Sequence, residues 1–193
     1  MSNTVSDGDA ERGQLADGYA VLAQCWRDPT EDLVAAVEDG DLEGVLPGVR
    51  DVSLEELRVE HARLFVGPAD PPCPPYESVY RDGDDGPGQV LGPSTRDVVN
   101  WYREYGVGLH PNWSDLPDHL ATELEFVAIL LDRGEADAAE QFLEEHPRQW
   151  FDDFATAVRD SDPLGFYREL LETTAAAIER ADDRPGDADV SDP

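Results

Sequence analysis

Apolar residues recur at three- and four-residue steps along most of this chain, the spacing that places them on one face of an α-helix. The first stripe predicts a helix from residue 11 that ends before a proline at position 29, and its members are Leu15, Tyr19, Leu22 and Trp26. No stretch alternates with period two over a useful length, so strands are not predicted. The pattern predicts an all-α, single-domain bundle of about seven to nine helices with a long Pro-rich loop in the middle.

Capping residues and glycines predict where these helices begin and end. Ser53 and Glu56 form a capping box, and Gly40 and Gly134 follow the last apolar position of two predicted helices. The other predicted first residues or caps are Thr30, Ser94, Pro117 with Asp118, Pro147, and Asp162 with Pro163. The helix that opens at Pro117 and Asp118 is the longest apolar one, so we expect it to be the most buried.

The stretch from His61 to Tyr80, HARLFVGPADPPCPPYESVY, begins as the end of a helix and then stops being helical. Its five prolines fix φ and push the preceding residues out of the α region, while large apolar side chains stand between them. Such a rigid, apolar loop can hold an extended peptide, or it can fold over its own core, and the residues alone leave both open. His61 lies on an apolar helix face, where a core histidine is expected more often than a ligand.

The charge balance is strongly acidic. The chain of 193 residues has 44 Asp and Glu against 14 basic residues, all of them arginine, and a formal net charge of -30. Molar salt shortens the screening length to about 3 Å and removes most of the resulting self-repulsion. The composition therefore predicts adaptation to a very salty cytoplasm, and it disfavours binding to nucleic acid or to anionic lipid.

The two cysteines, the polar N-terminus and the short apolar runs predict a soluble, cytoplasmic protein. Cys25 and Cys73 are expected to be free thiols, because a chain of this size needs no disulfide and no C-x-x-C motif is present. The polar N-terminus has no signal-peptide pattern, and the longest apolar run is too short to span a bilayer. We expect disordered residues at 1–10 and 182–193 and a helical domain at 11–181.

The most suggestive polar residues are Asp118, His119 and Glu123. His119 and Glu123 are one helical turn apart beside the apolar stripe, and Asp118 is expected to lie away from them near the helix N-terminus. Three interpretations are open: a metal site, an acid–base pair, or a helix-start element that binds its own loop or a peptide. The third is favoured, because no second metal motif, nucleophile elbow or phosphate loop accompanies the group.

The other polar residues give weaker evidence for a functional site. His110 and His146 lie at element ends, Cys73 has no base partner in the sequence, and Ser78 is not in a G-x-S-x-G motif. The sequence therefore predicts no catalytic residue, metal or cofactor.

Three segments in order resemble the TorD/DmsD/NarJ family of redox-enzyme maturation chaperones. They are EHARLFVGP, PPYESVY and PDHLATELEF, and they span roughly residues 55–131. The resemblance implies an all-helical cytoplasmic chaperone that binds the twin-arginine signal peptide or the apoprotein of a molybdenum-containing oxidoreductase until its cofactor is inserted. We expect no cofactor, and the sequence leaves open whether the chain is a monomer or a helix-swapped dimer.

The resemblance further implies a peptide-binding surface on particular residues. Leu64 and Phe65 would line its apolar part, and Pro75, Tyr76 and Ser78 would shape the loop. Its polar anchor would be Asp118, His119 and Glu123. Two other classes remain open: a helical scaffold for another protein partner, and a metal-dependent hydrolase that uses His119 and Glu123.

Overall fold

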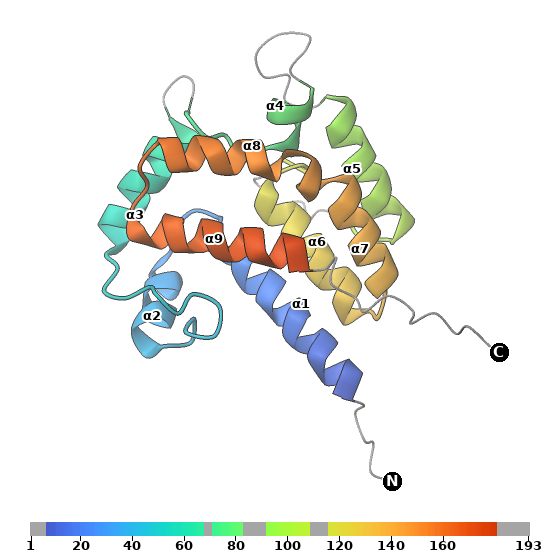
Figure 1. The fold of residues 1–193 in the computed structure, drawn as a ribbon, viewed down its shortest axis with the longest axis horizontal. Helices are drawn as coiled ribbons and strands as arrows, with labels where there is room; N and C mark the ends of the chain where they lie inside the picture. The colour runs from blue at the N-terminus through green and yellow to red at the C-terminus, as the bar shows by residue number, and fades with distance from the viewer. Residues whose placement is uncertain (1–6, 68–70, 83–91, 109–115, 181–193) are drawn as a thin grey trace, which may run out of the picture.

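The computed structural model describes residues 7–67, 71–82, 92–108 and 116–180, and within them the fold is entirely helical (Figure 1). This confirms the predicted all-α fold, with nine α-helices and a π-helical turn, η1, among the described residues. The helices are α1 (Asp7–Cys25), α2 (Glu31–Asp39), α3 (Leu54–His61), η1 (Ala62–Val66), α4 (Glu77–Arg81), α5 (Pro93–Glu104), α6 (Leu120–Asp132), α7 (Ala136–Glu145), α8 (Pro147–Asp160) and α9 (Gly165–Arg180).

Helix α6 lies in the centre of the molecule, as its apolar composition predicts. Its side chains are buried on nearly every face. The contact between α1 and α6 is more extensive than the contact between any other two helices. Figure 1 shows α8 and α9 side by side in front of α6, with α5 and α7 at one end and α2 and α3 at the other. Burial on all sides makes α6 the element against which the rest of the chain is positioned.

Most of the predicted helix boundaries are confirmed, and each has a local cause. The Thr30 hydroxyl accepts a hydrogen bond from Leu33 N at 3.2 Å and begins α2, and the Ser53 hydroxyl does the same for Glu56 N at 3.3 Å in α3. Gly40 follows α2 with φ of 82°, a left-handed conformation that costs glycine little. Pro147 is the first residue of α8, where its missing N–H is not needed.

Three predicted helix starts are wrong. Helix α5 begins at Pro93 rather than being capped by Ser94, whose hydroxyl instead donates to Asp82 Oδ2 at 2.6 Å. Helix α9 begins at Gly165, after Asp162 and Pro163. Asp118 lies in a turn before α6 and His119 is extended, because backbone contacts with the Pro-rich loop hold both outside the helix.

The expected disordered ends of the chain can be compared with the structure only in part. Helix α1 begins at Asp7, ahead of the start predicted at residue 11. Residues 1–6 and the predicted tail at 182–193 lie outside the described residues, as does His110.

The first part of the stretch from His61 to Tyr80 folds over its own core. Leu64, Phe65 and Cys73 are all buried, and Cys73 N donates to Leu64 O at 3.0 Å, which brings the loop back onto η1. Gly67 makes this close approach possible, because a Cβ at that position would lie 3.2 Å from Pro71 Cα. Of the two interpretations that the sequence left open, the packed loop describes these residues.

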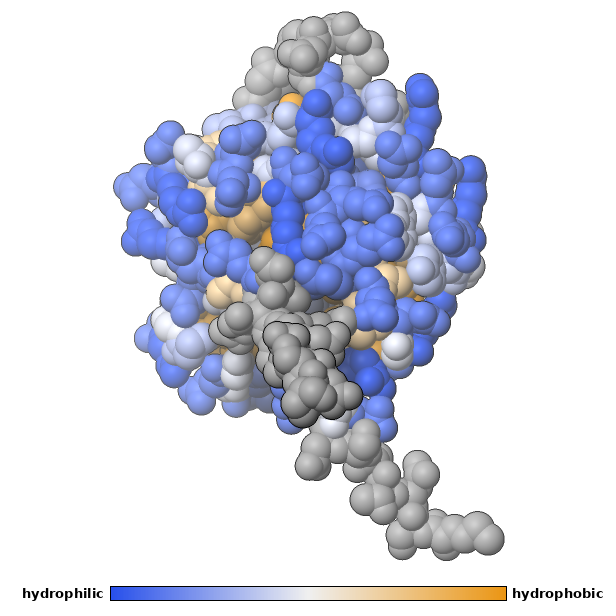
Figure 2. All heavy atoms as spheres, turned by 45° about the vertical axis from the view of Figure 1, so that its right-hand side comes forward, coloured by the Kyte–Doolittle hydropathy of each residue, from blue (hydrophilic) through white to orange (hydrophobic). Residues whose placement is uncertain are grey.

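The outer surface is dominated by hydrophilic side chains. Figure 2 shows them over most of the visible face, with apolar residues appearing only in small patches between them. Among the described residues, no helix is long and apolar enough to cross a membrane.

Candidate functional site

Two extended segments from distant parts of the chain meet beside the N-terminus of α6. Tyr76 and His119 form an isolated antiparallel bridge. Two backbone hydrogen bonds flank it, from Glu77 N to Asp118 O at 3.0 Å and from Leu120 N to Pro75 O at 2.9 Å. Prolines before Tyr76 hold the first segment extended, since they exclude the α region for the residues that precede them. The bridge brings five of the eight predicted site residues together: Pro75, Tyr76, Ser78, Asp118 and His119.

His119 caps α6. Its backbone is extended, with φ of -75° and ψ of 136°, and its Nδ1 accepts a hydrogen bond from Ala121 N at 3.0 Å. Burial lowers the pKa of His119 to about 3, so the ring is neutral at physiological pH and Nδ1 keeps its lone pair for the cap. The prediction that His119 lies on the flank of the helix is therefore wrong, whereas its interpretation as a helix-start element agrees with the geometry.

Asp118 is completely buried and turns toward the Pro-rich loop. Its Oδ2 accepts a hydrogen bond from Ser78 N at 3.1 Å. Its other oxygen, Oδ1, and the hydroxyl of Ser78 have no hydrogen-bond partner in the described part of the chain. Buried polar atoms are normally paired, and each unpaired one costs about 1–3 kcal/mol. These two atoms therefore mark a place where a ligand can supply the missing hydrogen-bond partners.

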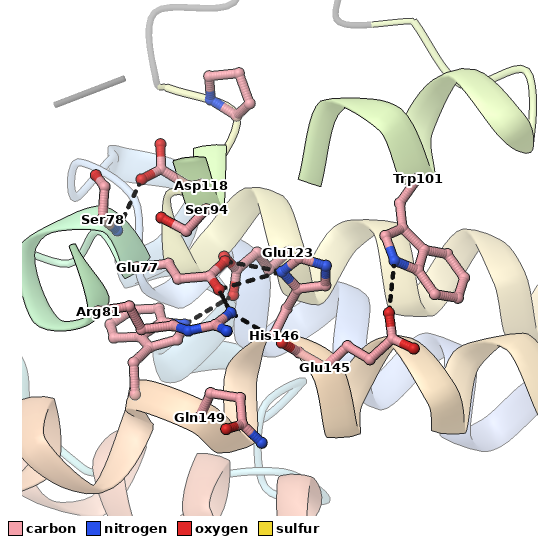
Figure 3. A network of polar contacts seen from close by, with 12 residues as sticks. Glu77, Ser78, Arg81, Ser94, Trp101, Asp118, Glu123, Glu145, His146 and Gln149 are labelled. Carbon is pink, nitrogen blue, oxygen red and sulfur yellow. Dashed lines mark hydrogen bonds and ion pairs between the residues drawn. The ribbon is translucent and has the colours of Figure 1, made fainter. Parts of the chain in front are cut away.

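Glu77 lies directly beneath the bridge, in a polar network that Figure 3 shows. Its side chain is fully buried and contacts His146 Nδ1 at 3.0 Å through Oε2 and at 3.2 Å through Oε1. Arg81, one turn along α4, forms an ion pair with the same carboxylate. Burial by itself would raise the pKa of Glu77, but the hydrogen bond and charge of His146 and the hydrogen bond of Arg81 outweigh it and lower that pKa.

Glu123 reaches the same network from the first turn of α6. It is also fully buried, and its Oε2 accepts a hydrogen bond from Trp150 Nε1 at 3.2 Å. Burial and the neighbouring Glu77 carboxylate raise the pKa of Glu123 well above its ordinary value. This shift favours the protonated form of Glu123 beside the Glu77 carboxylate, whose own pKa is lowered.

This arrangement separates His119 from Glu123, which the sequence had placed together. The His119 ring caps α6 through Ala121, while Glu123 points toward Glu77 and Trp150. In the described ranges, no group of three or more His, Cys, Asp or Glu side chains is placed to hold a metal ion. Among the described residues, the hypothesis of a metal-dependent hydrolase therefore has no converging metal ligands to support it.

Leu64 and Phe65 lie in the aromatic core on the other side of the Pro-rich loop. The Phe65 ring packs against Trp26 at 5.7 Å and Tyr167 at 5.4 Å between centroids, and Leu64 has no exposed surface. They support the loop from behind and form no open apolar wall. His61 is a core residue as well, with its ring 5.2 Å from Phe65 and its Nδ1 3.2 Å from Asp28.

Four residues of the network were not predicted from the sequence: Glu77, Arg81, Trp150 and His146, of which His146 was expected only to lie at the end of an element. The spacing of Glu77 and Arg81, one turn apart after a proline run, is a weak signal for a local ion pair. The partner His146 lies 69 positions from Glu77 in sequence, so no local pattern could have connected them.

Comparison with known proteins now identifies the family. The profile of the nitrate reductase delta subunit family matches residues 23–156, which is more than half of the chain and includes every residue of the bridge and the network. This chain belongs to that family.

Individual relatives agree with the family match. The chain is 25% identical over 126 residues to the chaperone protein TorD of Shewanella loihica, covering 64% of this chain and 60% of the relative. It is 31% identical over 118 residues to the Tat proofreading chaperone DmsD of Salmonella paratyphi A, covering 61% of this chain and 56% of the relative. These matches thus span less than two thirds of the relatives' own length.

A solved structure resembles the whole fold. The crystal structure of a candidate redox enzyme maturation protein from Archaeoglobus fulgidus superposes with a TM-score of 0.61 at 25% sequence identity. The match covers 95% of this chain and all of the other.

Proposed function

We propose that this chain is a redox-enzyme maturation chaperone. It binds the twin-arginine signal peptide, the apoprotein, or both, of a molybdenum-containing oxidoreductase, and it assists cofactor insertion before export or assembly. Membership of the nitrate reductase delta subunit family supports this role, as do relatives named as TorD and DmsD chaperones. Such a chaperone acts in the cytoplasm, before its client is exported, and holds the client without transforming it chemically.

The observation that carries the proposal is the unpaired polar pair beside the bridge. Asp118 Oδ1 and the Ser78 hydroxyl are buried in neighbouring segments, and neither has a partner among the described residues. An extended peptide presents backbone N–H and C=O groups that match one acceptor and one hydroxyl. The peptide would therefore be anchored where the two segments meet, with Tyr76 and His119 on the bridge itself.

The remaining predicted site residues have supporting roles in this proposal. Leu64 and Phe65 hold the Pro-rich loop in place from the core, and Glu123 fixes Glu77 below the bridge. Apolar contact is expected to contribute more than charge in molar salt, because the screening length there is about 3 Å. Either a monomer or a helix-swapped dimer can present this surface.

The substitution Asp118→Asn tests the proposal. The Asn carbonyl can still accept from Ser78 N, but its amide replaces the unpaired acceptor Oδ1 by a donor, which should weaken binding of a twin-arginine peptide about tenfold. Isothermal titration calorimetry in 1 M KCl measures the affinity, and circular dichroism confirms that the variant is folded. Asp39→Asn, on the exposed end of α2, is the matched control and should bind like the wild type.

Two results would contradict the proposal. Wild-type affinity in Asp118→Asn would remove Asp118 from the binding surface. Failure of the wild-type protein to bind any signal peptide would favour a helical scaffold that serves another partner.

A further inference from the structure

Helix α4 covers the two unpaired polar atoms to which we propose that the peptide binds. Ser78 is only 1% exposed, and Asp118 has no exposed surface. Backbone N–H groups of α4 bind Asp118 directly, from Ser78 N to Oδ2 at 3.1 Å and from Glu77 N to the carbonyl oxygen at 3.0 Å. The Tyr80 hydroxyl, also on α4, is a third buried atom without a hydrogen-bond partner among the described residues. A peptide can therefore reach Ser78 and Asp118 only after one of the enclosing segments moves.

Helix α4 depends on its neighbours to stay folded and in place. It has five residues, the fewest of any α-helix in the described part of the chain, and isolated helices shorter than about 12–15 residues are marginal in water. Figure 1 shows it at the upper edge of the bundle, and it packs against α8 and α5. Its Tyr80 ring stacks on Trp150 of α8, with 5.5 Å between centroids and 20° between planes. Short elements of this kind are the ones that open while the rest of a protein stays folded.

Two charged side chains attach α4 to the junction of α7 and α8 (Figure 3). Buried Glu77 contacts His146 Nδ1 with both of its carboxylate oxygens. Arg81, one turn along α4, pairs with Glu77, and the same nitrogen, Nη1, donates to Glu145 O at 2.9 Å. Arg81 thus joins the end of α4 to the last residue of α7, and it compensates the buried charge of Glu77.

The Arg81 ion pair is the part of this attachment that water can reach. The Arg81 side chain is 35% exposed, whereas that of Glu77 is 0% and that of His146 is 3% exposed. A polar pocket of about 900 Å³ lies beside the network, and its lining includes Arg81 and His146. Water in this pocket can take over the hydrogen bonds of Arg81 when α4 moves, so the contact is easier to break than a fully buried ion pair.

We propose that α4 is a latch, which opens to admit the peptide to Ser78 and Asp118 and which the ion pair of Arg81 with Glu77 holds closed. The inference rests on the proposed function and adds the regulation of the same site. Opening exposes to water the three buried polar atoms under α4, and their hydration offsets part of the contacts that are lost. Because the peptide binds only the open form, its apparent affinity is reduced in proportion to the fraction of the protein that is open.

The substitution Arg81→Gln in the full chain weakens the latch and leaves both unpaired atoms in place. A twin-arginine peptide should associate with the variant about fivefold faster and bind about fivefold more tightly, with an unchanged dissociation rate. If Arg81 only shaped the binding surface, the same substitution would instead weaken binding. Stopped-flow fluorescence with a dye-labelled peptide in 1 M KCl measures both rates. The matched control, Arg159→Gln, removes an exposed ion pair with Glu172 (3.1 Å) between α8 and α9, and it should leave both rates unchanged.

A second measurement reports on the latch even if no peptide binds. The substitution Ser78→Cys places a thiol of nearly the same size under α4, and iodoacetamide labels it only when the latch is open. Peptide mass spectrometry compares this thiol with native Cys25, which is 1% exposed within α1 and requires wider unfolding to react. We expect the thiol at position 78 to be labelled more than about tenfold faster than Cys25, and about fivefold faster again when Arg81→Gln is added.

The two measurements separate the latch from the proposed function. Labelling at position 78 that is no faster than at Cys25, or that Arg81→Gln does not accelerate, would overturn the latch whatever the peptide does. Weaker or slower peptide binding by Arg81→Gln would overturn the latch and leave the proposed function in place. Faster labelling as expected, without peptide binding by any of these proteins, would support the latch and refute the proposed function.

Discussion

The substitution Glu123→Gln should change how the stability of the protein depends on pH. Glu123 is fully buried, and in the folded protein burial and the Glu77 carboxylate raise its pKa well above the ordinary value of 4.5. The folded chain therefore keeps a proton that the unfolded chain releases above about pH 4.5. It follows that this residue costs the wild type stability as pH rises, until the pH passes the raised pKa.

The magnitude follows from proton linkage. One proton held only by the folded state costs about 1.4 kcal/mol of unfolding free energy for each pH unit within that window. A glutamine at position 123 does not titrate, yet its amide can donate to Glu77 and its carbonyl can accept from Trp150 Nε1. The stability of the variant relative to the wild type should thus increase by about 1.4 kcal/mol per pH unit above pH 5.

Urea unfolding at pH 5, 6 and 7 in 1 M KCl, followed by circular dichroism, measures this difference. Glu38→Gln, on the exposed face of α2, is the control and should give a difference from the wild type that does not change with pH. Parallel stability curves for Glu123→Gln and the wild type would show that Glu123 is ionised in the folded state, which would refute the raised pKa of Glu123.

Three further substitutions test the fold. Phe65→Ala should cost about 3–5 kcal/mol of unfolding free energy, because its ring is 4% exposed and packs on Trp26 and Tyr167; a loss under 1 kcal/mol in urea unfolding would place it at the surface. Gly134→Ala should destabilise the protein by about 1 kcal/mol, because φ is 82° at that position. Gly18→Ala lies inside α1 with open space around its Cβ, and it should stabilise the protein by about 0.5–1 kcal/mol. Thermal unfolding that shows the same sign for both substitutions would refute the backbone argument.

The fold was accessible from the sequence because its causes are local. Thr30, Ser53 and Pro147 each fix a helix start through contacts within one turn, and the apolar stripes between them indicate which faces are buried. The start of α6 was misplaced for the opposite reason. Asp118, in a turn, and His119, which is extended, are kept outside the helix by contacts with Pro75 and Glu77, which lie about 40 positions earlier. Helix propensity does not report such a distant contact.

The candidate site was accessible only in part, for the same reason. The bridging residues lie in motifs that could be recognised one by one, whereas the pairing of Glu77 with His146 exists only after α4 and the junction of α7 and α8 come together. Phe65 shows a different limit. An aromatic residue beside a proline run fits either a groove or a core, and only the packing of Trp26, Phe154 and Tyr167 around it decides for the core.

The bridge between Tyr76 and His119 also has a kinetic consequence. Two backbone hydrogen bonds join the two segments, which are about 40 residues apart in sequence. Closing the loop between them costs conformational entropy, and neither hydrogen bond alone compensates for that cost. The amides of Glu77 and Leu120 should therefore exchange with solvent in a single cooperative opening, at one common rate. If that opening also exposes Asp118, its rate would set an upper limit on how fast the peptide that we propose as ligand reaches the buried carboxylate.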